Sequence, residues 1–446
     1  RTYRADGLLA TQTFGSGLTE SRAYDQQGRM TTWTLGGETR TYTYDANSNV
    51  VTRATPAESR LYVYDTEDRL TEDRLTAGSG STHTMVYDLN GNRTQLNTTA
   101  YLYTANTNRL TQVGDAPLTL DPAGNTTQDQ EGNTHVHDAA GRLAEVKRHG
   151  RVLARYTYDH RHRRTRKDRH GPRRDVVFHY DLEGRPIAET QNTGVLIRAY
   201  VYDDEAPIAQ VTKGATDTLV HLHADPLNTP RLATDSNRVT VWRYDGNAFG
   251  DTLPNEDPDG NAKKTTVNLR FPGQYYDAET GLHYNWNRYY DPRIGRYVTS
   301  DPIGIIPALN PIPLWLGNSL MVWKDVPVRV VDNLLVTYGL NHSYVYVSNN
   351  PLRQTDPMGL LWPIDCVNCF IQSNKVDKAT QECKEEFKKC AGNTEKVLQF
   401  MDKYNAGYIS TAMLNCVAKK SGQAFDEAVK ACGKCGLAGP KPPMRR

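Results

Sequence analysis

Residues 39–50 read TRTYTYDANSNV, and this alternating run closed by Tyr-Asp decides the fold. Threonine alternates with arginine or tyrosine before the turn, which is the period of a half-buried β-strand. The Asp and Asn residues that follow Tyr44 bond to nearby backbone groups and tolerate positive φ. The stretch therefore predicts a strand, a tight turn and a returning strand.

The same unit recurs through most of the chain, and most neighbouring copies lie 16 to 23 residues apart. Full copies are Tyr24-Asp25, Tyr44-Asp45, Tyr64-Asp65, Tyr87-Asp88, Tyr158-Asp159, Tyr180-Asp181, Tyr202-Asp203 and Tyr244-Asp245, and degenerate copies are Tyr103, Asp121 and His137-Asp138. One unit is too small to bury its own apolar face, so stacked hairpins must share a continuous sheet. We predict a mainly β body in which each pair is a packing and turn element without a catalytic role.

The composition changes near residue 360. Residues 361–446 hold 14 lysines and arginines against 9 aspartates and glutamates, whereas residues 1–360 hold 39 against 42. All twelve histidines lie before this point, and all seven cysteines lie after it. The cysteines are Cys366, Cys369, Cys383, Cys390, Cys416, Cys432 and Cys435. This division predicts two units: a body at residues 1–360, and a tail at residues 361–446 that has a net charge of +5.

Two further features concern targeting. The sequence opens inside a repeat with Arg1, so we expect it to be a fragment of a longer protein whose targeting signals lie elsewhere. The most apolar stretch, Ile303–Trp323, is interrupted by Pro307, Pro311 and Pro313, and a membrane-spanning helix is therefore not expected there.

A possible catalytic group lies in FPGQYYDAETGLHYNWNRYYDPRIGRYVTSDPIG at residues 271–304 and in TDPMGL at 355–360. If the fold brings Asp301 and Asp356 close together, both carboxyl groups cannot ionise without a large cost in free energy, so one can act as an acid and the other as a base. Arg288 could stabilise charge that develops on a peptide carbonyl. The alternative is that both aspartates only open turns, as Asp-Pro often does.

The Tyr-Asp units resemble the YD repeats of the RHS family, which also occur in insecticidal toxin-complex C subunits and in teneurins. HLHADPLNTPRLATD at 221–235 and VWRYDGNAFG at 241–250 resemble that family too, and residues 271–304 resemble its associated core. The resemblance covers roughly residues 1–360. It implies a β-sheet that spirals into a hollow shell around a C-terminal toxin. Family shells are usually longer, so the shell can be incomplete here.

The resemblance also implies self-cleavage after the terminal DPxGL motif. The family's roles fall on Asp301, Asp356 and Arg288, the cut bond joins Leu360 to Leu361, and the products are expected to stay together. This implies a repeat body (1–270), a core (271–360) and a variable toxin (361–446). The chain departs from the family pattern at Ile305, where Leu is usual, and at an insertion over residues 305–340.

The tail reads as a small, mainly α domain with several short amphipathic helices. Cys366–Cys369 and Cys432–Cys435 have CxxC spacing, so disulfides and a four-thiolate zinc site are both open. We favour disulfides because Cys383 and Cys390 share a helical stripe and also need partners. No other cofactor is expected, and the absence of histidine argues against His-dependent nuclease or Cys-His protease chemistry.

The resemblance to the RHS family implies a secreted antibacterial toxin that is delivered into target cells, as by type VI secretion. The implied partners are a cognate immunity protein and a secretion spike or adaptor. The basic helices favour disruption of a target membrane, with a periplasmic or membrane site of action. Nucleic acid is not specifically indicated. The alternatives are a tail with unknown enzymatic chemistry and a structural or adhesive surface protein of the teneurin kind.

Overall fold

The computed structural model describes residues 1–169, 175–302, 314–316, 319–321 and 343–360. By its internal contacts the chain divides into two units, Arg1–Leu361 and Trp362–Arg446, and all described residues belong to the first. Regular structure in the described ranges consists of β-strands and one 3-10 helix, η1 (Val347–Asn349). The predicted mainly β fold of the body is confirmed, whereas the predicted helical tail lies outside the described residues.

Two large antiparallel sheets of thirteen strands each follow the chain order, so that every strand pairs with the next one. The first contains β1 (Thr2–Tyr3), β2 (Leu9–Thr13), β3 (Thr19–Tyr24), β4 (Met30–Leu35), β5 (Glu38–Tyr44), β6 (Val50–Ala54), β7 (Glu58–Tyr64), β8 (Leu70–Gly78), β9 (His83–Tyr87), β10 (Arg93–Leu96), β11 (Thr99–Tyr103), β12 (Leu110–Val113) and β13 (Ala116–Pro117).

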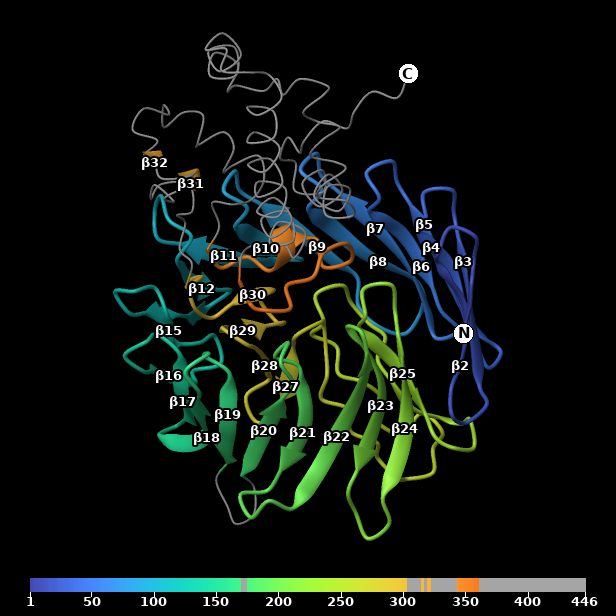
Figure 1. Cartoon of the computed structure of the whole chain (residues 1–446). Coiled ribbons are helices and arrows are strands. Elements are labelled where there is room, and N and C mark those ends of the chain that lie inside the picture. The colour runs from blue at the N-terminus through green and yellow to red at the C-terminus, as the bar shows by residue number, and fades with distance from the viewer. Residues whose placement is uncertain (170–174, 303–313, 317–318, 322–342, 361–446) are drawn as a thin grey trace, which may run out of the picture. The chain divides into compact units, whose positions relative to one another are not determined.

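The second sheet contains β14 (Thr119–Leu120), β15 (Thr126–Gln128), β16 (Thr134–His137), β17 (Leu143–Arg148), β18 (Arg151–Tyr158), β19 (Arg164–Arg169), β20 (Val176–Tyr180), β21 (Pro186–Thr190), β22 (Leu196–Asp203), β23 (Ala206–Thr212), β24 (Thr218–Ala224), β25 (Pro230–Thr234) and β26 (Thr240–Arg243). A four-stranded sheet follows, with β27 (Tyr275–Asp277), β28 (Leu282–Asn285), β29 (Arg288–Asp291) and β30 (Arg296–Tyr297). Figure 1 shows this small sheet in yellow between the two large ones. Within the predicted insertion, only the hairpin of β31 (Leu314–Leu316) and β32 (Ser319–Met321) is described.

Most Tyr-Asp pairs close a turn with their own polar groups. In the copy at residues 44–49, Asp45 N donates to Asn49 O over 3.0 Å, and Asp45 Oδ1 accepts the Asn49 amide at 2.8 Å. The Tyr44 hydroxyl donates to Met30 O on the neighbouring strand at 2.6 Å. Ser48 has a φ of 69°, the left-handed conformation that such turns need. The predicted turn role is therefore confirmed for most of the pairs, whereas Asp245 instead forms ion pairs with Arg40 and Arg243.

The strand before this turn has the predicted alternation. Arg40 and Tyr42 are buried, whereas Thr39, Thr41 and Thr43 are exposed. Successive side chains point to opposite faces of a sheet, so one face of β5 packs inward and the other is polar. The TRTYTYD pattern thus fixes both the strand and its orientation.

The small sheet packs against the second large sheet around a buried charge cluster. Arg164 on β19 pairs with Asp277 on β27, and Lys167 Nζ lies 2.7 Å from Asp277 Oδ1. The Arg164 guanidinium lies over the rings of Tyr156, Phe178, Tyr275, Tyr284 and Tyr289. Cation–π contacts and ion pairing together compensate the desolvation of these charges.

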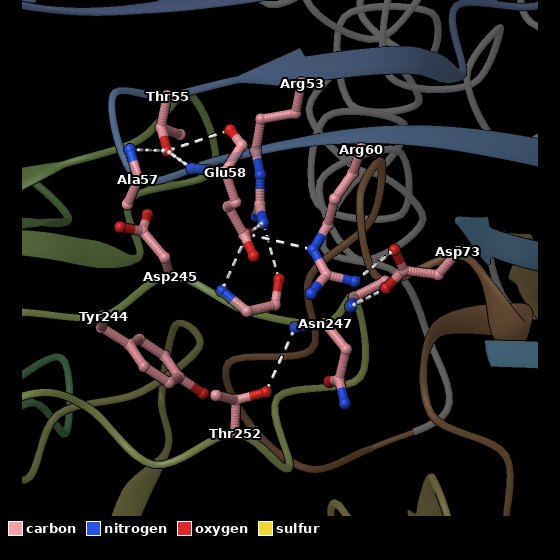
Figure 2. A network of polar contacts seen from close by, with 12 residues as sticks. Arg53, Thr55, Ala57, Glu58, Arg60, Asp73, Tyr244, Asp245, Asn247 and Thr252 are labelled. Carbon is pink, nitrogen blue, oxygen red and sulfur yellow. Dashed lines mark hydrogen bonds and ion pairs between the residues drawn. The ribbon is translucent and has the colours of Figure 1, made fainter. Parts of the chain in front are cut away.

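The loop after β26 is fastened to the first large sheet by charged groups (Figure 2). Arg53 pairs with Glu58 and donates to Gly246 O at 2.6 Å, while Glu58 accepts the Gly246 amide at 3.0 Å. Asp73 accepts the Ala248 amide at 2.7 Å. Residues nearly two hundred positions apart are thereby joined, so the two large sheets are coupled through side chains and main chain.

Residues 343–360 lie along turns of the first large sheet. Asn350 Nδ2 donates to Asn49 Oδ1 and to Asp68 O, both at 2.8 Å. In several other copies the residue that corresponds to Asn49 is an arginine, and Arg29 reaches the carbonyl of the next turn at 2.8 Å. The shorter asparagine leaves its turn available to the C-terminal segment. The contact fixes the position of the segment at residues 343–360, which contains the predicted catalytic residue Asp356.

Candidate functional site

The three residues predicted for self-cleavage come from separate parts of the core. Arg288 begins β29, Asp301 follows β30, and Asp356 lies in the segment 343–360. The Ser343 carbonyl accepts both the Asp301 amide at 2.8 Å and Arg288 Nη1 at 3.2 Å. This carbonyl therefore joins the C-terminal segment to the small sheet.

One guanidinium nitrogen bridges the two aspartates. Arg288 Nη2 lies 3.0 Å from Asp301 Oδ2 and 3.0 Å from Asp356 Oδ2. The side chains of Arg288 and Asp301 are fully buried, and that of Asp356 is 7% exposed. The structure thus brings together all three residues that the sequence singled out.

Burial raises the pKa of Asp356, and the nearby Asp301 carboxylate raises it further, whereas Arg288, Tyr297 and the Leu360 amide oppose the shift. When two carboxyl groups lie side by side in a buried site with only one cation between them, ionising both costs a large electrostatic free energy. The pair is therefore suited to hold one proton between two acidic sites. Such a pair supplies an acid and a base at one place.

The main chain just before the predicted scissile bond is held in a turn. The Leu360 amide donates to Asp356 Oδ1 at 2.9 Å, and Arg288 Nε donates to Gly359 O at 2.5 Å. Gly359 has a φ of +61°, and a Cβ there would overlap the carbonyl oxygen of Asn285. Glycine is therefore required for the close approach of the two backbones. Leu361, the other half of the predicted bond, lies outside the described residues.

Two site residues were missed in the sequence, Asn285 and Tyr297. The Tyr297 hydroxyl donates to Asp356 Oδ2 at 2.6 Å, and Asn285 Nδ2 donates to that hydroxyl at 2.7 Å and to Asp356 O at 2.8 Å. Both lie within the core motif at residues 271–304, close in sequence to Arg288. That proximity was the available signal, but spacing alone does not identify their hydrogen-bond partner.

Several other predicted features fall on residues that the structure does not describe. These are all seven cysteines, with the disulfide and zinc alternatives, and most of the insertion at 305–340. In the described part of the chain, no group of three or more His, Cys, Asp or Glu is arranged to hold a metal ion. Likewise, no described helix is long and apolar enough to span a membrane.

Curated relatives match the chain over part of its length. It is 32% identical over 229 residues to double-stranded DNA deaminase toxin A of Burkholderia cenocepacia, and the matched region covers 44% of this chain and 16% of that protein. It is 28% identical over 259 residues to the tRNA3(Ser)-specific nuclease WapA of Bacillus spizizenii, covering 56% and 9%. It is 25% identical over 302 residues to toxin protein Tse5 of Pseudomonas aeruginosa, covering 59% and 20%. The chain thus spans no more than a fifth of the length of any of these three relatives.

A solved structure shares the fold. The Photorhabdus luminescens Tc holotoxin pore with mutant TccC3 superimposes with a TM-score of 0.59 and 20% identity, over 81% of this chain and 19% of that one. The family model described as the teneurin YD-shell matches residues 55–306. This match covers more than half of the 446 residues, and the chain therefore belongs to the teneurin YD-shell family.

Proposed function

We propose that residues 1–360 form a toxin shell that cuts its own chain between Leu360 and Leu361. The observation that carries the proposal is the bridge from Arg288 to both Asp301 and Asp356, at 3.0 Å each, beside the turn that leads to this bond. The relatives support the toxin role, because they include a deaminase toxin, a tRNA nuclease and a toxin protein.

The proposed reaction is hydrolysis by a carboxyl pair. The ionised carboxylate takes a proton from water as the water oxygen attacks the Leu360 carbonyl carbon, and the protonated partner donates its proton to the Leu361 nitrogen. The C–N bond then breaks, and the pair again holds a single proton. Arg288 stabilises the negative charge that forms on the carbonyl oxygen. Neither a nucleophilic serine or cysteine nor a metal is required.

The test is expression of the full chain, followed by gel electrophoresis and N-terminal sequencing. The unchanged chain should give two fragments, the second beginning at Leu361. Asp301→Asn and Asp356→Asn should each give one uncut chain. Asp291→Asn is the matched control, because Asp291 is also buried on the same small sheet but bonds Arg293 and Gln130. Normal cutting in both site variants would disprove the assignment.

For the released tail we propose toxicity by membrane disruption, countered by an immunity protein and delivered by a type VI-like system with a spike or adaptor. Its net charge of +5 favours attraction to anionic membranes. Expression of residues 361–446 in the cytoplasm or periplasm of bacteria tests the toxin role, and dye leakage from anionic liposomes tests the mechanism. Growth inhibition without leakage would favour an enzyme. No inhibition in either compartment would favour a structural or adhesive surface protein.

A further inference from the structure

Asn285 and Tyr297 form a closed hydrogen-bonded ring with Asp356. Asn285 Nδ2 donates both to the Tyr297 hydroxyl at 2.7 Å and to the Asp356 carbonyl at 2.8 Å. The hydroxyl in turn donates to Asp356 Oδ2 at 2.6 Å. The ring therefore fixes the main chain and the side chain of Asp356 at the same time.

Arg288, the arginine that bridges the two carboxyl groups, also contacts this hydrogen-bonded group. The Arg288 guanidinium carbon lies 3.5 Å from the centre of the Tyr297 ring, and Arg288 Nη2 shares Asp356 Oδ2 with the tyrosine hydroxyl. Tyr297 is 1% exposed and Asn285 is fully buried. Burial, together with the Asp356 charge, raises the pKa of Tyr297 well above its ordinary value. The hydroxyl thus remains a proton donor throughout the pH range in which carboxyl groups titrate.

We infer that Tyr297, oriented by Asn285, is a positioning residue that holds Asp356 Oδ2 in place and stabilises the carboxylate form of Asp356 against the opposing effect of burial. A hydrogen bond donated to a carboxylate stabilises the charged form, and charge-assisted bonds of this kind are among the stronger ones in proteins. Asp356 Oδ1 is occupied by the Leu360 amide, so Oδ2 is the oxygen on which arginine and tyrosine converge. This inference rests on the proposed self-cleavage.

A purely structural role for Tyr297 makes a different prediction. Its ring belongs to a buried aromatic cluster with Phe271, Tyr290 and Tyr346, and packing there depends on the ring rather than on the hydroxyl. Loss of the hydroxyl should then leave the pH dependence of cleavage unchanged. If Tyr297 instead stabilises the Asp356 carboxylate, its loss raises the pKa of Asp356, and the acidic limb of the cleavage profile moves to higher pH.

The experiment compares Tyr297→Phe with the unchanged full chain. Pulse-labelled chains from cell-free translation are chased in buffers from acidic to mildly alkaline pH, and the uncut fraction is followed with time. We expect the acidic limb of Tyr297→Phe to move up by about one pH unit, with about tenfold slower cleavage on that limb. Tyr290→Phe is the matched control, since its hydroxyl is equally buried and donates to Phe249 O at 2.9 Å, away from the pair.

A second variant guards against loss of fold. Asn285→Ala keeps the tyrosine hydroxyl but removes the bond from Asn285 to that hydroxyl and the bond from Asn285 to the Asp356 carbonyl, and we expect a smaller shift in the same direction. Cutting of the unchanged chain together with unshifted profiles for both variants would overturn the inference and leave the proposed function intact. An unchanged chain that stays whole would instead overturn the proposed function.

Discussion

Arg288 Nη2 lies 3.0 Å from Asp356 Oδ2, although 68 residues separate the two along the chain. The same nitrogen lies 3.0 Å from Asp301 Oδ2. A single guanidinium nitrogen therefore joins the two aspartyl-proline segments, and the insertion at 305–340 does not prevent their meeting.

The first prediction concerns the shape of the Arg288 guanidinium group. Arg288 also donates to the carbonyls of Gly359 and Ser343, which a single ammonium group could not reach together with both aspartates. Arg288→Lys should therefore slow cleavage by about a hundredfold. The uncut fraction of the full chain measures this, and Arg293→Lys should cut normally. Cleavage of Arg288→Lys at the rate of the unchanged chain would contradict the bridging role.

The turn before the scissile bond gives a second prediction. Gly359→Ala places a methyl group against the Asn285 carbonyl and should abolish cleavage while the sheets remain folded. Gly132→Ala is the control, since Gly132 has a φ of +77° but no atom lies within 4 Å of the position that a Cβ would take there. It should cost about 1 kcal/mol of stability and leave cleavage unchanged. Equal cleavage in both variants would show that the close approach at Gly359 is unimportant.

A third prediction concerns the charge cluster of the small sheet. The paired cations Arg164 and Lys167 lower the pKa of Asp277 against the opposing effect of burial. Asp277→Asn leaves two buried cations without their shared carboxylate and should cost about 3 to 5 kcal/mol in the free energy of unfolding. Because the folded pKa of Asp277 is lowered, its contribution is present above the unfolded value and is lost as pH falls.

Denaturant unfolding of the full chain measures this change. The exposed pair of Lys213 and Asp217 provides the control, and Asp217→Asn should leave the unfolding midpoint unchanged. A midpoint shift of similar size in both variants would contradict the special cost of the buried cluster.

The contact between β24 and the first sheet predicts a pH dependence. His223 packs edge-on against Phe14 with ring centres 4.4 Å apart, and burial, with His221 and Arg22 nearby, lowers the pKa of His223 to about 3. The unfolded chain binds this proton more readily, so stability is fully present above the unfolded pKa and is lost as pH falls below it. The loss amounts to about 1.4 kcal/mol per pH unit.

Thermal unfolding as a function of pH tests this prediction. His223→Gln should flatten the dependence on the acidic side. His179→Gln is the control, because the exposed His179 makes an equivalent 2.9 Å bond to Thr190 while His223 bonds Thr234 at 2.9 Å. An unchanged slope in His223→Gln would refute the prediction.

Local patterns made part of this structure predictable. The Tyr44-Asp45 turn is formed by side chains within five residues of one another, so its motif is visible in the sequence. The predicted meeting of Arg288, Asp301 and Asp356 came from the family resemblance as well as from their chemistry. No local sequence pattern predicts that Asn350 bonds Asn49. Nor does one predict that Arg164 is enclosed by aromatic rings from the second large sheet and from the small sheet. Such contacts depend on how distant hairpins stack.

The most direct measurement is mass spectrometry of the full chain allowed to cut itself in ¹⁸O-labelled water. Hydrolysis by the carboxyl pair predicts an N-terminal fragment that ends at Leu360 and carries heavy oxygen in its new carboxyl group, and none in Asp356→Asn. An unlabelled end, a cut at another bond, or undiminished cutting of Asp356→Asn would contradict hydrolysis by Asp301 and Asp356.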